Sequence, residues 1–318
     1  MRRRDFLAAL TTGMGSIAMP AAALFRADFQ VYEYKSVDGC AIKADVHGVD
    51  KFVEKPVLIY IHGGALIGGT RKKLPRVVPD LLLKLDAVVV LIDYRLAPET
   101  KLPAIVEDVQ DAIRWVRQDG PKLFHIDPDR LAVAGDSAGG YLTLMAGFSV
   151  KPRPRVLAVF WGYGDITSPW YSEPEPFYVR QTPVSREEAF RSIGTKCLTE
   201  PPEANRRGRF YLYCRQNGLW PKEIAGHDPK SESKWFEAYR PVRNVSKKYP
   251  PTILVHGTAD TDVPYQESKV MATKLQEAGV EHELITVSGG GHGLAEIGDT
   301  EMARIYEKVS AFLKARIG

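Results

Sequence analysis

Uninterrupted apolar runs alternate with helical patterns along most of this chain. Apolar runs occupy residues 57–61, 87–92, 131–134, 156–160, 252–255 and 284–287, each long enough for a buried strand. Between and after these runs, apolar residues recur at helical spacing over 81–85, 104–117, 141–146, 265–278 and 302–313. Strands without a polar face are typical of parallel sheets that are buried on both sides. The pattern therefore predicts an α/β fold in which helices cover both faces of a mostly parallel central sheet.

The first strand-like segments follow a different pattern. Residues 29–35 alternate between polar and apolar side chains, and a second strand-like segment covers residues 40–46. Asp38-Gly39 lies between them and is typical of a two-residue hairpin turn. We therefore expect the sheet to begin with an antiparallel hairpin.

The alternation of strands and helices stops over residues 161–249. This segment is rich in prolines, charges and aromatic side chains, and its helix signals are weak, as over 185–193. A long insertion between two parallel strands is expected to form a cap over their carboxyl ends. Most of its aromatic side chains are expected to pack together, because a small cap needs large side chains for a core.

The first 23 residues have the features of an export signal. Arg3-Arg4-Asp5-Phe6-Leu7 is similar to a twin-arginine motif, and the apolar run after it ends near Ala21-Ala22-Ala23, a small-residue cleavage site. The alternative is a membrane anchor, which the glycines and Pro20 disfavour. We expect residues 1–23 to be removed on export to the periplasm or outside the cell, leaving one α/β domain over 24–318 that contains the cap insertion.

Charge and cysteine content exclude several classes of function. The formal net charge of +4 is too small to indicate nucleic acid or a polyanionic surface as the partner. Cys40, Cys197 and Cys214 show neither a disulfide framework nor zinc-ligand spacing, although a Cys197–Cys214 bridge is compatible with an exported protein. No metal and no cofactor are expected.

One glycine-rich motif stands between an expected strand and an expected helix. Residues 135–139 read Gly-Asp-Ser-Ala-Gly, which fits G-x-S-x-G. In this context Ser137 is expected on a strained turn with its hydroxyl exposed, as a nucleophile. The helix that begins behind it favours an anion near the amide of Ala138. The alternative is an ordinary glycine-rich loop.

An acid and a base follow at the carboxyl ends of later strands. Asp260 comes after the strand at 252–255, and His292 comes after the last strand, in a glycine-rich loop. Ligands of α/β sheets bind at these ends, and the order Ser137, Asp260, His292 is that of α/β-hydrolases. We therefore predict a catalytic triad. Asp262 is a rival acid, which we expect to point elsewhere.

Other polar residues have simpler interpretations. His62 and His256 are expected to make structural hydrogen bonds, and Asp136 to fix the turn at Ser137. We expect four further histidines to lie at the surface and two basic clusters to be solvated: His47, His125, His227, His282, residues 71–73 and residues 206–209.

Three motifs together resemble the hormone-sensitive-lipase-like branch of α/β-hydrolase-fold serine esterases. They are His-Gly-Gly at 62–64, Tyr-Arg-Leu-Ala-Pro-Glu at 94–99 and Gly-Asp-Ser-Ala-Gly-Gly at 135–140. The resemblance implies an oxyanion hole formed by the amides of Gly64, Ala65 and Ala138. Ala65 stands where the family usually has a third glycine, and the Asp260 loop is more similar to that of prolyl-oligopeptidase-type hydrolases. The family's N-terminal cap helices have no evident counterpart, so residues 161–249 are expected to form the cap alone.

These features predict a carboxylesterase that cleaves short- to medium-chain acyl esters through an acyl-enzyme on Ser137. The same triad would also serve an amidase, a peptidase or a carbohydrate-ester deacetylase. A non-catalytic binding protein on this fold is a more remote alternative, because His292 is present. The expected partner is a small ester, with no nucleic acid and no membrane span in the mature chain.

Overall fold

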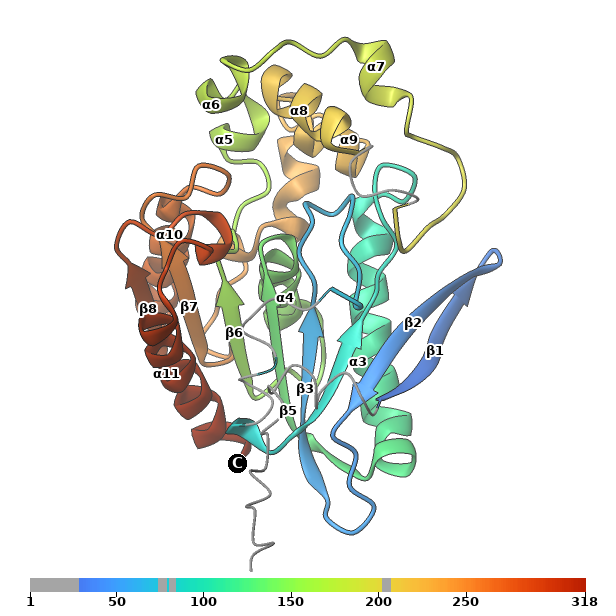
Figure 1. Ribbon diagram of the computed structural model, residues 1–318, viewed down its shortest axis with the longest axis vertical. Helices are drawn as coiled ribbons and strands as arrows, with labels where there is room; N and C mark the ends of the chain where they lie inside the picture. The colour runs from blue at the N-terminus through green and yellow to red at the C-terminus, as the bar shows by residue number, and fades with distance from the viewer. Residues whose placement is uncertain (1–28, 74–78, 80–83, 202–206) are drawn as a thin grey trace, which may run out of the picture.

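The computed structural model of the protein describes residues 29–73, 79, 84–201 and 207–318 (Figure 1). The expected export signal at 1–23 lies outside the described residues, as does most of the helix expected over 81–85. Among the described helices, none combines the length and the apolar character that a membrane span requires.

In the described part of the chain, eight strands form one sheet in the order β1-β2-β4-β3-β5-β6-β7-β8. All neighbours from β4 to β8 are parallel, whereas β2 pairs antiparallel with β1 and with β4. The predicted mostly parallel sheet is therefore confirmed. The strands are β1 (Phe29–Val37), β2 (Cys40–His47), β3 (Lys55–Ile61), β4 (Val88–Ile92), β5 (Ile126–Asp136), β6 (Val156–Phe160), β7 (Thr252–Gly257) and β8 (His282–Val287).

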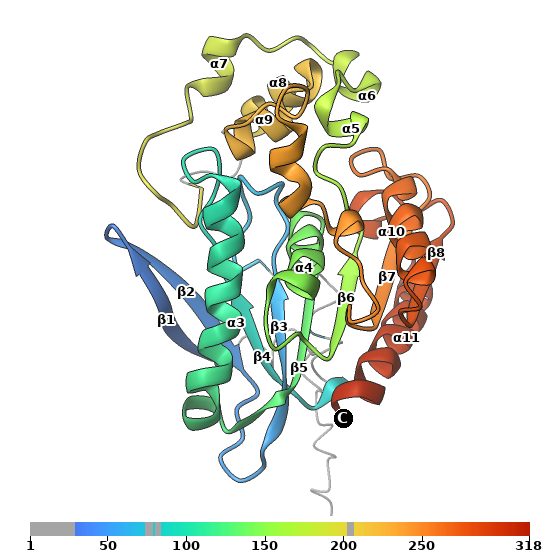
Figure 2. The same ribbon diagram turned by 180° about the vertical axis from the view of Figure 1, so that it is seen from behind.

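Helices cover both faces of the sheet, as the apolar runs predicted. On one face lie α3 (Leu102–Phe124), α4 (Ala138–Ser149) and α10 (Tyr265–Glu277), which share a core with alternate β3 residues such as Ile59 (Figure 2). On the other face α11 (Asp299–Ile317) packs against the intervening residues, including Leu58 and Tyr60. Because both faces are covered, β3, β4 and β6 are buried along almost their whole length.

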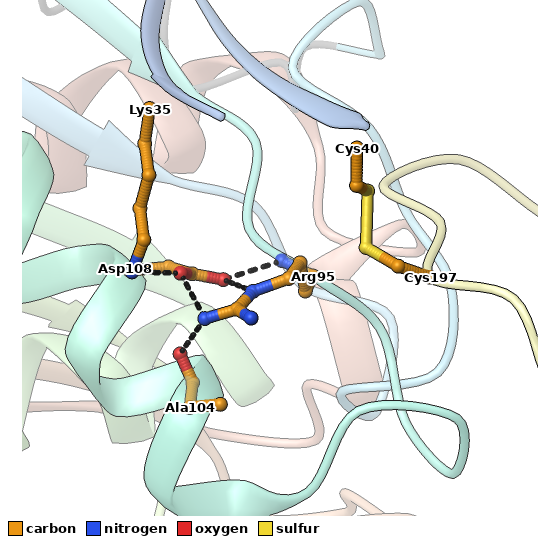
Figure 3. Close-up of a disulfide and its surroundings, with 6 residues drawn as sticks. All are labelled: Lys35, Cys40, Arg95, Ala104, Asp108 and Cys197. Atoms are coloured by element: carbon orange, nitrogen blue, oxygen red, sulfur yellow. Dashed lines mark hydrogen bonds and ion pairs between the residues drawn. A yellow bond between two sulfur atoms is a disulfide. The ribbon is translucent and has the colours of Figure 1, made fainter. Parts of the chain in front are cut away.

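The hairpin turn between β1 and β2 has the expected conformation. Asp38 and Gly39 both have positive φ, 49° and 78°, as the two central residues of a type I′ turn do. Lys35 of β1 reaches across to α3, where its ammonium lies 2.8 Å from Asp108 Oδ1 (Figure 3). The hairpin is thereby held against the helix.

The segment between β6 and β7 forms a cap of short helices above the carboxyl ends of the strands (Figures 1 and 2). Its own core contains the fully buried rings of Tyr171, Phe210, Trp220 and Phe236. Aromatic packing thus holds the cap together, as expected. Its elements are α5 (Pro169–Ser172), α6 (Pro176–Val179), α7 (Arg186–Phe190), α8 (Arg207–Asn217), α9 (Trp220–Ala225), η1 (Ser233–Tyr239) and η2 (Pro241–Arg243).

The Cys197–Cys214 bridge, which the sequence left open, does not form. Cys197 forms a disulfide with Cys40 instead (Figure 3). Cys214 is a buried free thiol. Cys214 lies on α8 within the apolar core, whereas the chain before α8 brings Cys197 to the start of β2. The disulfide therefore joins the cap to the β1–β2 hairpin.

Three residues expected at the surface are buried. Arg71 donates to Asp45 and Asp93, and Arg207 donates to Glu99 and to two backbone carbonyls near the β3 loop. His47 is only 5% exposed, and its ring stacks on Phe29. A sequence cluster of basic residues does not reveal these buried acidic partners, because they come from distant segments.

Candidate active site

Ser137 lies on a sharp turn between β5 and α4. Its backbone has φ 52° and ψ −118°, a strained combination for a residue with a side chain. Glycines on either side make the turn sterically possible. A Cβ at Gly139 would lie 2.0 Å from the carbonyl oxygen of Ile61, and one at Gly135 would lie 2.4 Å from that of Gly139.

His292 connects Ser137 with Asp260. Its Nε2 lies 3.1 Å from Ser137 Oγ, and its Nδ1 lies 2.8 Å from Asp260 Oδ2. His292 begins the short helix η3 (His292–Leu294) after β8, and Asp260 lies in the loop after β7. The carboxyl ends of three parallel strands thus bring together residues that are far apart in the sequence.

The side chain of Asp260 is fully buried and surrounded by hydrogen-bond donors. Its Oδ1 accepts the amides of Asp262 and Val263, and its Oδ2 also lies 3.2 Å from His256 Nε2. Burial opposes ionisation of Asp260, but the hydrogen bonds from His256, His292 and Val263 outweigh it and hold its pKa well below the usual range. The carboxylate is therefore charged where it meets the imidazole.

His256 has the structural role expected from the sequence. Its Nδ1 lies 2.7 Å from Ser268 Oγ, and its Nε2 lies 3.0 Å from the carbonyl oxygen of Val263. The fully buried ring therefore connects the Asp260 loop with α10.

The environment of His292 favours its protonated form. Burial lowers the pKa of the imidazole, but the hydrogen bond to Asp260 and the charges of Asp262, Asp260 and Asp136 raise it above the ordinary histidine value overall. Proton uptake by this imidazole is therefore assisted by the carboxylates around it.

The loop after β3 lies beside Ser137 and has an unusual backbone. Gly64, Ala65 and Leu66 have consecutive positive φ values of 112°, 53° and 59°. A Cβ at Gly64 would lie 2.4 Å from the carbonyl oxygen of Gly68, so this position requires glycine. Ala65 has the left-handed conformation that a small side chain tolerates at a modest energetic cost.

Asp136 joins this loop to the turn at Ser137, as the sequence predicted. Its Oδ1 accepts the phenol hydrogen of Tyr60 at 2.8 Å and the amide of Gly63 at 3.2 Å. His62 is buried, stacks on Tyr94 and lies with its Nδ1 2.7 Å from the carbonyl oxygen of Gly63. These contacts fix the position of Gly64 and Ala65 relative to Ser137.

The expectation that Asp262 points elsewhere is wrong. Its Oδ2 lies 3.6 Å from His292 Nε2, the nitrogen that faces Ser137. Its Oδ1 accepts hydrogen bonds from three cap side chains: Tyr178 Oη at 2.5 Å, Tyr211 Oη at 2.5 Å and Arg215 Nη1 at 2.8 Å. The cap therefore holds Asp262 in the site.

Sequence reasoning missed Arg215 entirely. This α8 residue is 1% exposed, and its guanidinium lies 4.3–5.4 Å from the ring centroids of Trp170, Tyr171, Tyr178 and Tyr211. Burial opposes its charge, but the surrounding tyrosine oxygens and Asp262 raise its pKa overall. No local sequence signal marks it, because its partners lie on other elements.

A cavity of about 460 Å³ opens beside Ser137 and His292. Gly64, Ala65 and Asp262 line it together with these two residues. The rest of its wall is mostly apolar and comes from Trp161, Leu294, Ala295, Met302 and Tyr306. The cavity thus extends from the reactive groups towards α11, and its volume suits a small ligand.

Comparisons with known proteins agree with the fold. The sequence model of the alpha/beta hydrolase fold matches residues 58–296. The chain is 28% identical over 316 residues to the non-reducing polyketide synthase ausA of Aspergillus calidoustus, which covers 83% of this chain but 13% of the synthase. It is 25% identical over 262 residues to esterase LipC of Mycobacterium tuberculosis, covering 81% of this chain and 58% of LipC. The chain thus spans only part of these curated relatives.

Solved structures show the same fold. Carboxyl esterase 2 of the fungus Tuber melanosporum superposes with a TM-score of 0.65 at 20% identity, over 92% of this chain and 88% of that one.

Proposed function

The chain belongs to the α/β-hydrolase family, in its hormone-sensitive-lipase-like branch, and we propose that it is a carboxylesterase that acts through an acyl-enzyme on Ser137. The observation that carries the proposal is the continuous contact from Ser137 Oγ to His292 Nε2 and from His292 Nδ1 to Asp260 Oδ2, at 3.1 and 2.8 Å. A nucleophile, a base and an orienting acid at hydrogen-bond distance form the unit that acyl transfer requires.

Each step follows from these positions. Ser137 Oγ attacks the ester carbonyl carbon while His292 Nε2 takes the hydroxyl proton. The imidazolium then gives that proton to the leaving alcohol, and the acyl group stays on Ser137. Water, activated by His292 in the same way, attacks the acyl-enzyme and releases the carboxylic acid. Asp260 holds Nδ1–H and stabilises the imidazolium in both halves of the reaction.

The amides of Gly64, Ala65 and Ala138 are proposed to bind the oxyanion. Gly64 and Ala65 line the cavity beside Ser137, and Ala138 is the first residue of α4, where backbone amides point towards an anion. A donor of this kind typically contributes about 3 kcal/mol to stabilising the transition state. The strained loop after β3 supports this assignment, because its backbone is fixed by Asp136 and His62.

The acyl groups are proposed to be short to medium in length. The apolar wall formed by Leu294, Ala295 and Met302 stabilises methylene groups only as far as it extends, by about 0.8 kcal/mol each. We therefore expect kcat/KM to rise from acetyl to about butanoyl or hexanoyl and then to fall. A series of p-nitrophenyl esters from acetyl to palmitoyl, measured with EDTA, tests this. A maximum at dodecanoyl or longer contradicts the short acyl site, and loss of activity with EDTA contradicts a mechanism that needs no metal.

We also propose that the protein is exported through residues 1–23. The Arg3-Arg4 motif supports this, and so does the Cys40–Cys197 disulfide, because disulfides persist mainly in oxidising compartments. Replacing both arginines by lysine is expected to leave the precursor inside the cell. Unchanged export of this variant contradicts the twin-arginine route.

A further inference from the structure

One polar atom of the cavity has no role in the proposed triad. Asp262 Oδ2 lies 3.6 Å from His292 Nε2, and Asp262 lines the cavity with 22% of its side chain exposed. In the described part of the chain, the hydrogen bonds to this carboxylate all fall on Oδ1. Oδ2 is therefore available as an acceptor beside the reacting groups.

The position of this oxygen is fixed by the cap. Tyr178, Tyr211 and Arg215 together supply three donors to Oδ1, and Arg215 also lies 3.3 Å from the backbone carbonyl of Asp262. Since Arg215 is itself buried against four aromatic rings, the carboxylate has little freedom to turn. A fixed acceptor of this kind discriminates between ligands by whether they carry a matching donor.

The geometry assigns Oδ2 to the leaving-group side of the ester. A leaving alcohol receives its proton from His292 Nε2, so its oxygen must come within about 3 Å of that nitrogen. Oδ2 lies 3.6 Å from the same nitrogen, which places it next to the carbon atoms that follow the leaving oxygen. A hydroxyl group on the neighbouring carbon would reach it.

We propose that Asp262 selects esters whose alcohol part carries a second hydroxyl next to the ester oxygen, as in polyols and sugars. This inference rests on the proposed esterase function. Arg215 already balances the charge of Asp262, so the oxygen suits a neutral hydroxyl better than an ammonium group. A plain alkyl alcohol would cover the same oxygen without giving it a donor, which is costly because the carboxylate loses its remaining contact with water.

The test compares two esters with the same carbon skeleton, 2,3-dihydroxypropyl butanoate and propyl butanoate. The wild-type protein is expected to prefer the diol ester in kcat/KM by about 10- to 100-fold, the usual effect of a hydrogen bond to a charged group. Asp262→Asn should bring the ratio close to one, because its amide group no longer presents a charged acceptor. Using the ratio removes any effect of the substitution on His292, since that effect applies to both esters.

Tyr211→Phe is the matched control, because it removes one donor from Oδ1 and leaves the carboxylate in place. It should retain the diol preference. A wild-type ratio near one, or an unchanged ratio in Asp262→Asn, would overturn the subsite. Stronger preference for 2-aminoethyl butanoate than for the diol ester would overturn it in favour of a cation site.

The two proposals fail in different ways. Hydrolysis of both butanoates without a diol preference contradicts only the role of Asp262. Hydrolysis of neither ester contradicts the proposed carboxylesterase itself. If Asp262→Asn does not fold, which a thermal melt by circular dichroism reveals, the wild-type ratio alone decides.

Discussion

At the residue scale, the imidazole of His292 lies between two carboxylates with different surroundings. The carboxylate of Asp260 contacts Nδ1 and is fully buried, whereas that of Asp262 lies near Nε2 and faces the cavity. Only the first is placed to hold the tautomer in which Nε2 accepts the serine proton. The two acids are therefore expected to differ sharply in their effect on catalysis.

The first prediction compares the two acids directly. Asp260→Asn should lower kcat for p-nitrophenyl butanoate by about 10³- to 10⁴-fold, because the amide favours the wrong tautomer of His292. Asp262→Asn should lower it by about tenfold or less, since this substrate has no hydroxyl for Oδ2. Steady-state kinetics of both variants checks this, and a larger loss in Asp262→Asn would reverse the assignment of the acid.

The second prediction concerns pH. Despite its burial, the pKa of His292 is raised by the hydrogen bond to Asp260 and by the charges of Asp262, Asp260 and Asp136. Only the neutral imidazole accepts the serine proton, so activity is present above this pKa and is lost as the pH falls through it. The acidic limb of kcat/KM should therefore lie above about 6.5, the ordinary histidine value.

Asp262→Asn should move this limb to lower pH, because one negative charge beside Nε2 is removed. Tyr211→Phe, which leaves that charge in place, serves as the control. A pH–rate profile of kcat/KM for each protein checks the sign. A limb that moves to higher pH in Asp262→Asn contradicts the account.

At the element scale, the links between the cap and the rest of the protein include an ion pair and a disulfide. The Asp262–Arg215 ion pair joins α8 to the loop after β7, and the Cys40–Cys197 disulfide joins the segment before α8 to the β1–β2 hairpin. Each link joins the cap to a segment outside it, at Asp262 and at Cys40. The contribution of each link to the free energy of unfolding can therefore be measured separately.

Arg215→Met should lower the free energy of unfolding by about 3–5 kcal/mol, because it removes the cation that pairs with Asp262 and the donor to the hydroxyl of Tyr211. Arg209→Met on the same helix is the matched control. Arg209 is 52% exposed and pairs with Glu188, so its loss should cost about 0–1 kcal/mol. Equal losses in urea unfolding would show that Arg215 does not anchor the cap.

The disulfide closes a loop with a sequence separation of 157 residues. Cys40→Ser should lower the free energy of unfolding by about 2–4 kcal/mol. Dithiothreitol should destabilise the wild-type protein similarly and leave the variant unchanged. Alkylation of the unfolded, unreduced protein should modify Cys214 alone. Modification of Cys40 instead would indicate the Cys197–Cys214 pairing.

At the scale of the whole molecule, the features that the sequence predicted are those set by short segments. The parallel sheet, the Asp38-Gly39 hairpin and the strand–turn–helix around Ser137 each follow from adjacent residues. Asp260 and His292 were placed by their position after strands, a rule that holds across the fold.

The features that sequence reasoning missed depend on distant segments meeting. Arg215 reaches Asp262 across 47 positions, and Arg207 reaches Glu99 across 108. Cys40 and Cys197 are likewise brought together by the cap and the hairpin. Tertiary packing decides whether such residues are buried and which partners they have. A local sequence pattern contains no information about tertiary packing.

The proposed mechanism requires Ser137 to be the nucleophile of an acyl-transfer site. A fluorophosphonate, which reacts with activated serines, tests it by covalent labelling followed by peptide mass spectrometry. We expect one label per chain, on Ser137, with loss of ester hydrolysis in proportion to labelling. Labelling should be much slower in His292→Ala and absent in Ser137→Ala. A label on another residue, or ester hydrolysis that persists after Ser137 is fully labelled, would contradict it.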